Sequence, residues 1–129
     1  MNKEISFFLC KEKKGTIIGI DCCPDAEVSC CGEKLSAVKV GSVDAAKEKH
    51  VPVIEQDGNI VTVKVGSVEH PMLDEHYIQF IYLLTKEGGQ RKPLKPGEKP
   101  VAKFALAPGD EVIAAYEYCN LHGLWKKEI

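Results

Sequence analysis

The sequence predicts an all-β fold, arranged as an antiparallel β-sandwich, and three observations lead to this prediction. Short runs of β-favouring residues recur between turn residues from position 51 onward. Val61, Val63 and Val65 alternate with polar residues, as in a strand that buries one face. Beyond one short turn, no stretch has the apolar spacing of an amphipathic helix. Two packed antiparallel sheets are therefore the expected architecture.

Composition limits the class of protein. A chain of 129 residues fits one domain, or one domain with a small appendage. The formal net charge of -2 excludes a general attraction to nucleic acid or to an anionic membrane. The apolar run at residues 5–10 ends at Lys11, too early for a signal peptide or a membrane span. We therefore expect a cytoplasmic protein, in which six cysteines indicate metal or thiol chemistry rather than disulfides.

Residues 1–39 differ from the rest of the chain, because they contain five of the six cysteines. Strands are expected at residues 6–9 and 16–20, but so small a piece buries little apolar surface. One interpretation is a four-thiolate site for iron or zinc, formed by Cys10, Cys30, Cys31 and either Cys22 or Cys23. Against it, Cys10 is followed by Lys-Glu-Lys, so the usual chelating C-x-x-C pair is absent. Thiols that are simply packed or exposed are the favoured interpretation.

The remaining residues predict one helical turn and five strands. The turn is expected at residues 43–48, with Ser42 as its N-cap. Strands are expected at residues 51–55, 60–65, 78–84, 101–106 and 111–118. The run 78–84 is apolar on both faces apart from Gln79, which is typical of a central strand.

Turn residues separate these strands. Asp57-Gly58 predicts a tight hairpin between the first two. Pro96-Gly97 and Pro108-Gly109 predict turns, because proline fixes the first central position and glycine accepts a positive φ. Residues 88–99 are rich in Gly, Lys and Pro, and we expect a mobile loop there.

The candidate metal ligands all lie at predicted strand ends or in loops. They are His50, His70, His76, Cys119 and His122. The last two form a C-x-x-H motif, which can close on one ion from a single turn. Loops from different strands gather at the ends of a sandwich, so these side chains can meet although they are far apart in sequence. Spacing alone leaves zinc as an alternative metal.

Three motifs resemble the superoxide reductases of the desulfoferrodoxin/neelaredoxin family. They are residues 48–53 (EKHVPV), residues 66–72 (GSVEHPM) with Glu75-His76, and residues 119–125 (CNLHGLW). The resemblance implies an immunoglobulin-like sandwich at residues 40–129 that carries one mononuclear non-haem iron. It also implies the ligand roles: His50, His70, His76 and His122 would be the equatorial imidazoles and Cys119 the axial thiolate.

The implied reaction is the one-electron reduction of superoxide to hydrogen peroxide, which makes the protein an oxidoreductase acting on superoxide. Five ligands leave one octahedral position open opposite the thiolate. Electron density from the thiolate would favour the reduction of superoxide and the release of peroxide. Lys49 would attract superoxide and hold a proton-bearing water. Glu48 would move into the open position after peroxide leaves. A solvated pair of charges is the alternative for both residues.

The resemblance also extends to the N-terminal segment and to the partners. Residues 1–39 resemble a desulforedoxin-like domain, with Cys10, Cys30 and Cys31 at matching places. Lys13 stands where the second chelating cysteine would be, so we expect no second iron; Cys22 and Cys23 match no ligand position. The family implies rubredoxin or a similar small electron donor, and a homo-oligomer, with a dimer favoured.

Two other classes of function remain open at this point. A non-catalytic metalloprotein could use the same ligands for zinc or stored iron. Zinc seldom takes five protein ligands, most of them nitrogen, which disfavours that function. An electron-transfer module could work through the N-terminal cysteines, and the missing C-x-x-C disfavours it.

Overall fold

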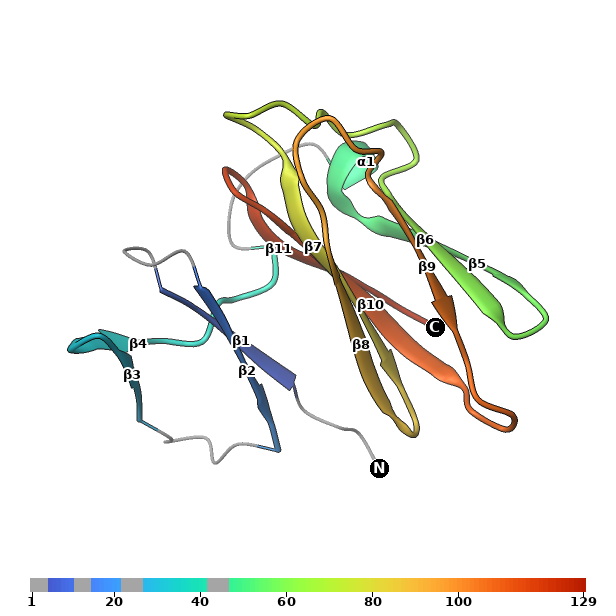
Figure 1. Ribbon diagram of the computed structural model, residues 1–129, viewed down its shortest axis with the longest axis horizontal. Helices are drawn as coiled ribbons and strands as arrows, with labels where there is room; N and C mark the ends of the chain where they lie inside the picture. The colour runs from blue at the N-terminus through green and yellow to red at the C-terminus, as the bar shows by residue number, and fades with distance from the viewer. Residues whose placement is uncertain (1–4, 11–14, 22–26, 42–46) are drawn as a thin grey trace. The chain divides into compact units, whose positions relative to one another are not determined.

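The computed structural model describes residues 5–10, 15–21, 27–41 and 47–129. The chain divides into two compact units, residues 1–39 and 40–129 (Figure 1). Strands account for nearly all the regular structure, and the single described helix has four residues. The all-β prediction is confirmed. None of the helices in the described ranges is long and apolar enough to cross a bilayer.

The first unit contains two small antiparallel pairs. Strand β1 (Ile5–Cys10) pairs with β2 (Gly15–Ile20), and β3 (Val28–Cys30) pairs with β4 (Glu33–Leu35). The sequence predicted the strands of the first pair, at residues 6–9 and 16–20, and missed those of the second. The β3–β4 connection is Cys31-Gly32, with φ of 50° and 79°. A two-residue hairpin loop needs such left-handed residues, and a cysteine in that place gave no hairpin signal.

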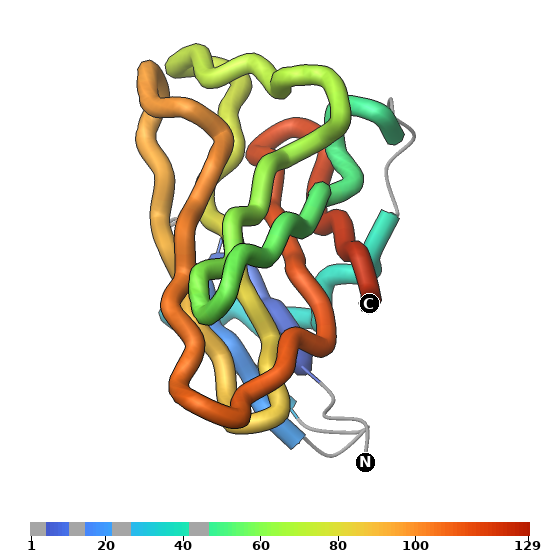
Figure 2. Tube along the Cα trace, turned by 90° about the vertical axis from the view of Figure 1, so that its right-hand side faces the viewer, coloured from blue at the N-terminus to red at the C-terminus, as the bar shows by residue number. Residues whose placement is uncertain are grey.

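The second unit is a sandwich of two antiparallel sheets (Figures 1 and 2). One sheet has the order β11-β10-β7-β8 and the other the order β5-β6-β9. Their bounds are β5 Pro52–Asp57, β6 Ile60–Val65, β7 Ile78–Thr85, β8 Gly88–Pro93, β9 Val101–Ala105, β10 Val112–Cys119 and β11 Gly123–Glu128. The β5–β6 hairpin and β9 form the layer that faces the viewer in Figure 2.

The core of the sandwich consists of side chains from both sheets. Val61, Val63 and Val65 are at most 1% exposed, which confirms the predicted alternation along β6. They belong to one cluster with Ile81 and Leu83 of the opposite sheet. Strand β7 has neighbours on both sides and is buried over seven of its eight residues, so the prediction of a central strand is also confirmed.

The predicted turns are present. Gly58, at φ 61°, lies in the two-residue loop between β5 and β6. Gly97 has φ 88°, and the Glu98 N–H donates to the Lys95 carbonyl across that turn at 3.1 Å. The bond from Asp110 N–H to the Ala107 carbonyl closes the Pro108-Gly109 turn at the same distance.

Part of the expected mobile loop is instead an edge strand. Residues 88–93 form β8, which pairs with β7 from Thr85↔Gly88 to Phe80↔Pro93. The glycines that suggested a loop have a packing role here. A Cβ on Gly89 would lie 1.9 Å from the Tyr82 hydroxyl oxygen, so only glycine leaves room for that ring. Proline is tolerated at the end of an edge strand.

Two other differences concern the ends of the second unit. Helix α1 comprises Lys47–His50, whereas residues 43–46 of the predicted turn and its N-cap Ser42 lie outside the described residues. Strand β11 was not predicted, because strands seldom favour lysines such as Lys126 and Lys127. Its inner residues Leu124 and Trp125 are buried, and it pairs with β10 over six residues.

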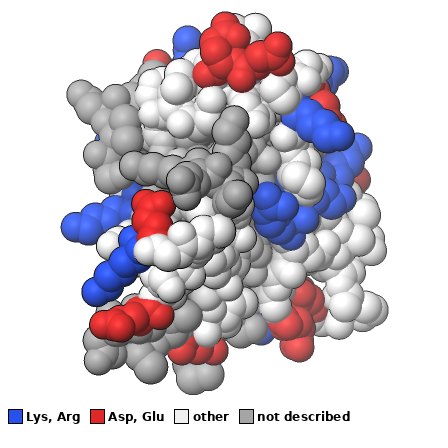
Figure 3. Space-filling view, turned by 60° about the vertical axis from the view of Figure 1, so that its left-hand side comes forward, with Lys and Arg blue, Asp and Glu red and all other residues white. Residues whose placement is uncertain are grey.

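Acidic and basic side chains both occur on the molecular face drawn in Figure 3, so neither sign covers that face alone. This mixture accords with the formal net charge of -2. Attraction of an anion would therefore depend on local charges at a particular site.

Candidate metal centre

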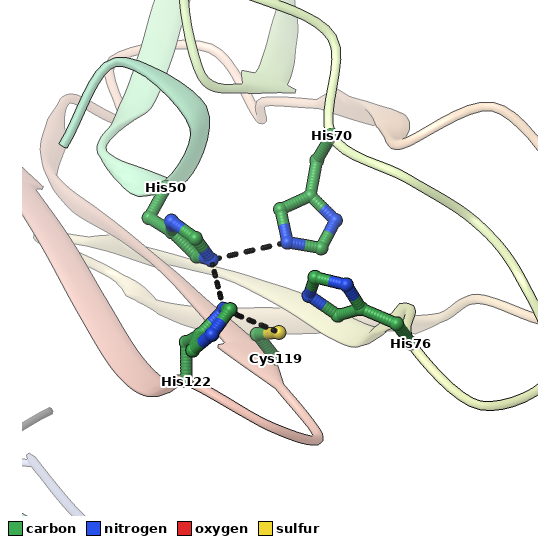
Figure 4. Close-up of side chains that lie close together, drawn as sticks. All are labelled: His50, His70, His76, Cys119 and His122. Atoms are coloured by element: carbon green, nitrogen blue, oxygen red, sulfur yellow. Dashed lines mark hydrogen bonds between the residues drawn. The ribbon is translucent and has the colours of Figure 1, made fainter. Parts of the chain in front are cut away.

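Five side chains from four separate segments converge at one end of the sandwich (Figure 4). His50 ends α1, His70 and His76 lie between β6 and β7, Cys119 ends β10, and His122 lies in the turn before β11. Each offers one ligand atom, and all five atoms lie within 4.8 Å of one another. The structure thus brings together all five residues that the sequence proposed as metal ligands.

The four imidazoles surround a common centre. Neighbouring ring centroids in the order His50, His70, His76, His122 and back to His50 are 4.7, 4.7, 4.9 and 4.8 Å apart. The corresponding planes meet at 79°, 81°, 83° and 86°, so each ring presents its edge to the next. Four nitrogens arranged in this way can occupy one plane around an ion.

The separations of the donor atoms fit a single ion. Nε2 of His50 lies 3.1 Å from Nε2 of His70 and 3.0 Å from Nδ1 of His122. Two nitrogens bound at right angles to one ion at about 2.1 Å are themselves about 3.0 Å apart. The Cys119 sulfur lies 3.9 Å from Nδ1 of His122. Nε2 of His76 is buried and has no hydrogen-bond partner among the described atoms, as expected for a ligand atom.

The protonation of His70 follows from one hydrogen bond. Its Nδ1 lies 2.7 Å from the Pro71 carbonyl oxygen, which can only accept. Nδ1 therefore carries the proton, and the lone pair of Nε2 is directed toward the other ligands. Burial lowers the pKa of His70 to about 4, and the neighbouring histidines add to this effect. The ring is thus neutral at physiological pH, which is the form that binds a metal.

The other ligands show the same influence of burial. Burial, and then His122, lower the pKa of His76. Burial raises the pKa of the Cys119 thiol, while the backbone N–H groups of Leu121 and His122 oppose that shift. A bound cation would stabilise the thiolate in the same direction as these two donors.

The donor set selects among metals. Four imidazole nitrogens and one thiolate exceed the four ligands of an ordinary structural zinc site. Imidazole and thiolate both suit iron, which accepts five or six ligands. The residues present therefore fit one mononuclear iron ion.

Trp125 supports the centre from the side. Its ring stacks on His50 at 5.1 Å between centroids and 29° between planes. Its indole N–H donates to the His122 carbonyl at 3.0 Å. This one side chain therefore contacts two of the residues that form the cluster.

Gly66 joins the His50 segment to the His70 segment. Its N–H donates to the Val51 carbonyl at 3.1 Å, and the Val68 N–H donates to the Glu48 carbonyl at 3.0 Å. A Cβ at Gly66 would lie 2.6 Å from the Glu48 carbonyl oxygen and 2.7 Å from the Lys49 backbone, and φ is 80°. The contact thus requires glycine for both space and backbone conformation.

Replacing Gly66 by alanine is expected to separate these two segments and to weaken metal binding by about 10–100-fold, the range seen for residues that support ligands. Titration of the apoprotein with Fe²⁺ against a competing chelator would measure the change. Gly97→Ala is a matched control, because Gly97 also has a positive φ, of 88°, but open space around its Cβ position. Equal affinities for the two variants would contradict the assigned role of Gly66.

Lys49 and Glu48 lie beside the centre on α1, and both are exposed. Lys49 lines a hollow of about 450 Å³ together with His70 and Met72. Its positive charge is one of the influences that lower the pKa of His76. The backbone carbonyl of Glu48 accepts from the Val68 N–H and the Ser67 hydroxyl. Their catalytic roles stay predictions.

Glu117 is a buried acid that the sequence reading missed. It is 0% exposed, and neither carboxylate oxygen has a hydrogen-bond partner among the described atoms. Burial raises the pKa of Glu117 to about 9, so the group is protonated at neutral pH. Its position in the run 111–118 gave no signal, because a glutamate in a strand normally faces solvent.

The three N-terminal cysteines that the structure describes are free thiols. Cys10 is buried, Cys30 is half-buried and Cys31 is exposed. The hydrogen bond with Cys10 is the main cause that raises the pKa of Cys30 to about 12, and the Cys31 sulfur lies 4.0 Å from that of Cys30. In the described ranges, the histidine and cysteine cluster above is the one group of three or more such side chains close enough to share an ion. Lys13, Cys22 and Cys23 lie outside those ranges.

Comparison with known proteins agrees with the geometry. A sequence model of the desulfoferrodoxin family matches residues 42–128. A desulfoferrodoxin from Syntrophotalea carbinolica is 44% identical over 128 residues, which cover 99% of each chain. The chain therefore belongs to the desulfoferrodoxin family, and the resemblance inferred from the three motifs is confirmed.

Solved structures extend the similarity to the fold. The crystal structure of the superoxide reductase from Treponema pallidum is 48% identical, with a TM-score of 0.90, and the match covers 99% of this chain and 100% of that one. A one-iron superoxide reductase from Giardia intestinalis is 38% identical, with a TM-score of 0.55, over 64% of this chain and 98% of its own. The sandwich is the fold of these redox enzymes.

Proposed function

We propose that this chain is a superoxide reductase, which reduces superoxide by one electron to hydrogen peroxide at one mononuclear non-haem iron. The observation that carries the proposal is the convergence of four imidazoles and one thiolate within 4.8 Å. The similarity to superoxide reductases over both the sequence and the fold supports it. One superoxide, one electron and two protons give one hydrogen peroxide.

The ligand residues prepare the site for that reaction. Iron, when bound, would supply the electron and a coordination position for the substrate. His50, His70, His76 and His122 are neutral donors, so the thiolate of Cys119 is the only anionic ligand. A ferrous centre would keep a formal charge of +1 and a ferric centre a charge of +2, and both attract a small anion.

Lys49 and Glu48 are the proposed catalytic residues outside the ligand set. The ammonium group of Lys49 would draw superoxide into the hollow that it lines and hold a proton-bearing water there. The exposed carboxylate of Glu48, one residue before it, would approach the open side of the site when product leaves. The short helix α1 places both residues directly before the ligand His50.

The wider assignments belong to the same proposal. Residues 40–129 would be the iron-binding unit and residues 1–39 a desulforedoxin-like segment without a second iron. Electrons would then come from rubredoxin or a similar small donor, and a homodimer is the expected assembly. The four described cysteines are all free thiols, which supports a reducing compartment such as the cytoplasm.

The test gives superoxide to the reduced, iron-loaded protein and measures both products. We expect one hydrogen peroxide for each superoxide consumed and no dioxygen. Evolution of dioxygen would identify a dismutase instead. Failure to consume superoxide would leave a non-catalytic metal site. Metal analysis of the same sample is expected to give one iron per chain, and two would show that the N-terminal thiols also bind iron.

A further inference from the structure

Asn120 connects two ligand-bearing segments through its side chain. Its amide oxygen accepts from the Tyr77 backbone N–H at 2.9 Å. Its amide nitrogen donates to the Glu75 carbonyl at 3.1 Å. The Asn120 backbone N–H also donates to the Tyr77 carbonyl, at 3.2 Å. Three hydrogen bonds from one residue therefore bracket His76, which lies between Glu75 and Tyr77.

These bonds lie at the point where the strand ladder becomes irregular. Strands β7 and β10 pair regularly from Leu84↔Ala114 to Phe80↔Tyr118, and the register shifts between Tyr118 and Cys119. Beyond that shift, Cys119 still pairs with Ile78, and Asn120 then bonds to the Tyr77 backbone through both its own backbone N–H and its side-chain amide. The side chain thus adds two hydrogen bonds to the last backbone bonds between the two segments.

The turn that Asn120 begins also shapes the surroundings of the thiolate. The backbone N–H groups of Leu121 and His122 donate to the Cys119 sulfur. Both donors lie in the turn between β10 and β11, and its first residue is Asn120. If the turn rotates, these two donors and the His122 ring move together relative to the sulfur.

We propose that Asn120 is a positioning residue, which holds the turn carrying Cys119 and His122 against the segment carrying His76 and so fixes the sulfur in the metal centre. The inference rests on the proposed metal centre but not on superoxide chemistry. Asn120 is separate from the ligand set, and it acts through the three ligands on the two segments that it joins.

Two substitutions separate the two hydrogen bonds of the side chain. Asn120→Ala removes both. Asn120→Asp keeps an acceptor for the Tyr77 N–H but loses the donor to the Glu75 carbonyl, and it places a carboxylate oxygen beside that carbonyl. Asn59→Ala is the matched control, because Asn59 is an exposed asparagine in the β5–β6 hairpin.

The measurements are the affinities for Fe²⁺ and for Co²⁺, by competition with a chelator, and the wavelength of the sulfur-to-metal charge-transfer band. We expect Asn120→Ala to weaken both affinities by about 10–100-fold and to shift the band, with Asn120→Asp intermediate. Asn59→Ala should match the parent protein in both. Co²⁺ reports the same sulfur without any redox reaction, so the result is independent of whether the parent reduces superoxide.

An Asn120→Ala protein with the band and the affinities of the Asn59→Ala control would overturn the proposal. Weaker binding with an unshifted band would also overturn it, because a loss of stability alone gives that pattern. If Asn120→Ala does not fold, the same measurements on Asn120→Asp test the proposal. An unshifted band in that variant counts against the inference in the same way.

Discussion

Replacing Cys119 by serine is expected to remove the sulfur-to-iron charge-transfer band completely and to reduce superoxide reduction by at least about 100-fold. The sulfur is the one anionic donor among five, and the loss of a ligand should exceed the 10–100-fold effect of residues that only support ligands. Absorption spectra of the iron-loaded variant and the rate of superoxide consumption would measure the two effects. Cys119 is 0% exposed, so the smaller serine should also reduce stability slightly.

Cys31→Ser is the control for this experiment, because Cys31 is an exposed thiol in the other unit. It is expected to leave the band, the iron content and the rate unchanged. A Cys119→Ser protein that keeps the band would show that another thiol binds the iron. A Cys31→Ser protein that loses iron would instead reveal a metal at the N-terminal cysteines.

Replacing Lys49 by alanine is expected to slow the reaction with superoxide by about 10-fold or more at low salt, because a cation at the mouth of a site raises the rate of encounter with an anion. In the parent protein the rate should fall as salt screens this charge. In the variant the dependence on ionic strength should be flatter. Stopped-flow or pulse-radiolysis rates at several salt concentrations would measure both quantities.

Lys103→Ala serves as the comparison, since Lys103 is an exposed lysine in the middle of β9. It carries the same charge but is expected to change neither the rate nor its dependence on salt. If Lys49→Ala and Lys103→Ala react equally fast, net charge alone governs the encounter, and Lys49 has no specific role.

The sequence predicted the five residues that converge in the structure because the signal for each of them is local. His50, His70 and the C-x-x-H pair each belong to a short motif, and turn residues placed each motif at a strand end. The valines of β6 predicted their own burial for a similar reason, because alternation along a strand is visible without knowledge of its partner. Patterns of this kind depend on residues that are close in the chain.

The features that were missed depend on contacts between distant residues. The glycines of β8 suggested a loop, because the packing of Gly89 against the Tyr82 ring is not visible in the sequence. Strand β11 needs β10 beside it, and without that partner two lysines suggest a tail. The role of Asn120 depends on Glu75 and Tyr77, more than 40 positions earlier in the chain. Glutamate side chains normally face solvent, so no sequence rule would predict that Glu117 is buried.

All five ligand atoms come from residues 40–129, and none comes from the first unit. The centre is therefore modular: the genetic loss or exchange of residues 1–39 would leave its donor set whole. The match to the Giardia intestinalis enzyme covers 98% of that enzyme but only 64% of this chain, so that enzyme is a shorter relative. A change in the cysteine pattern of residues 1–39 would thus leave all five clustered side chains in place.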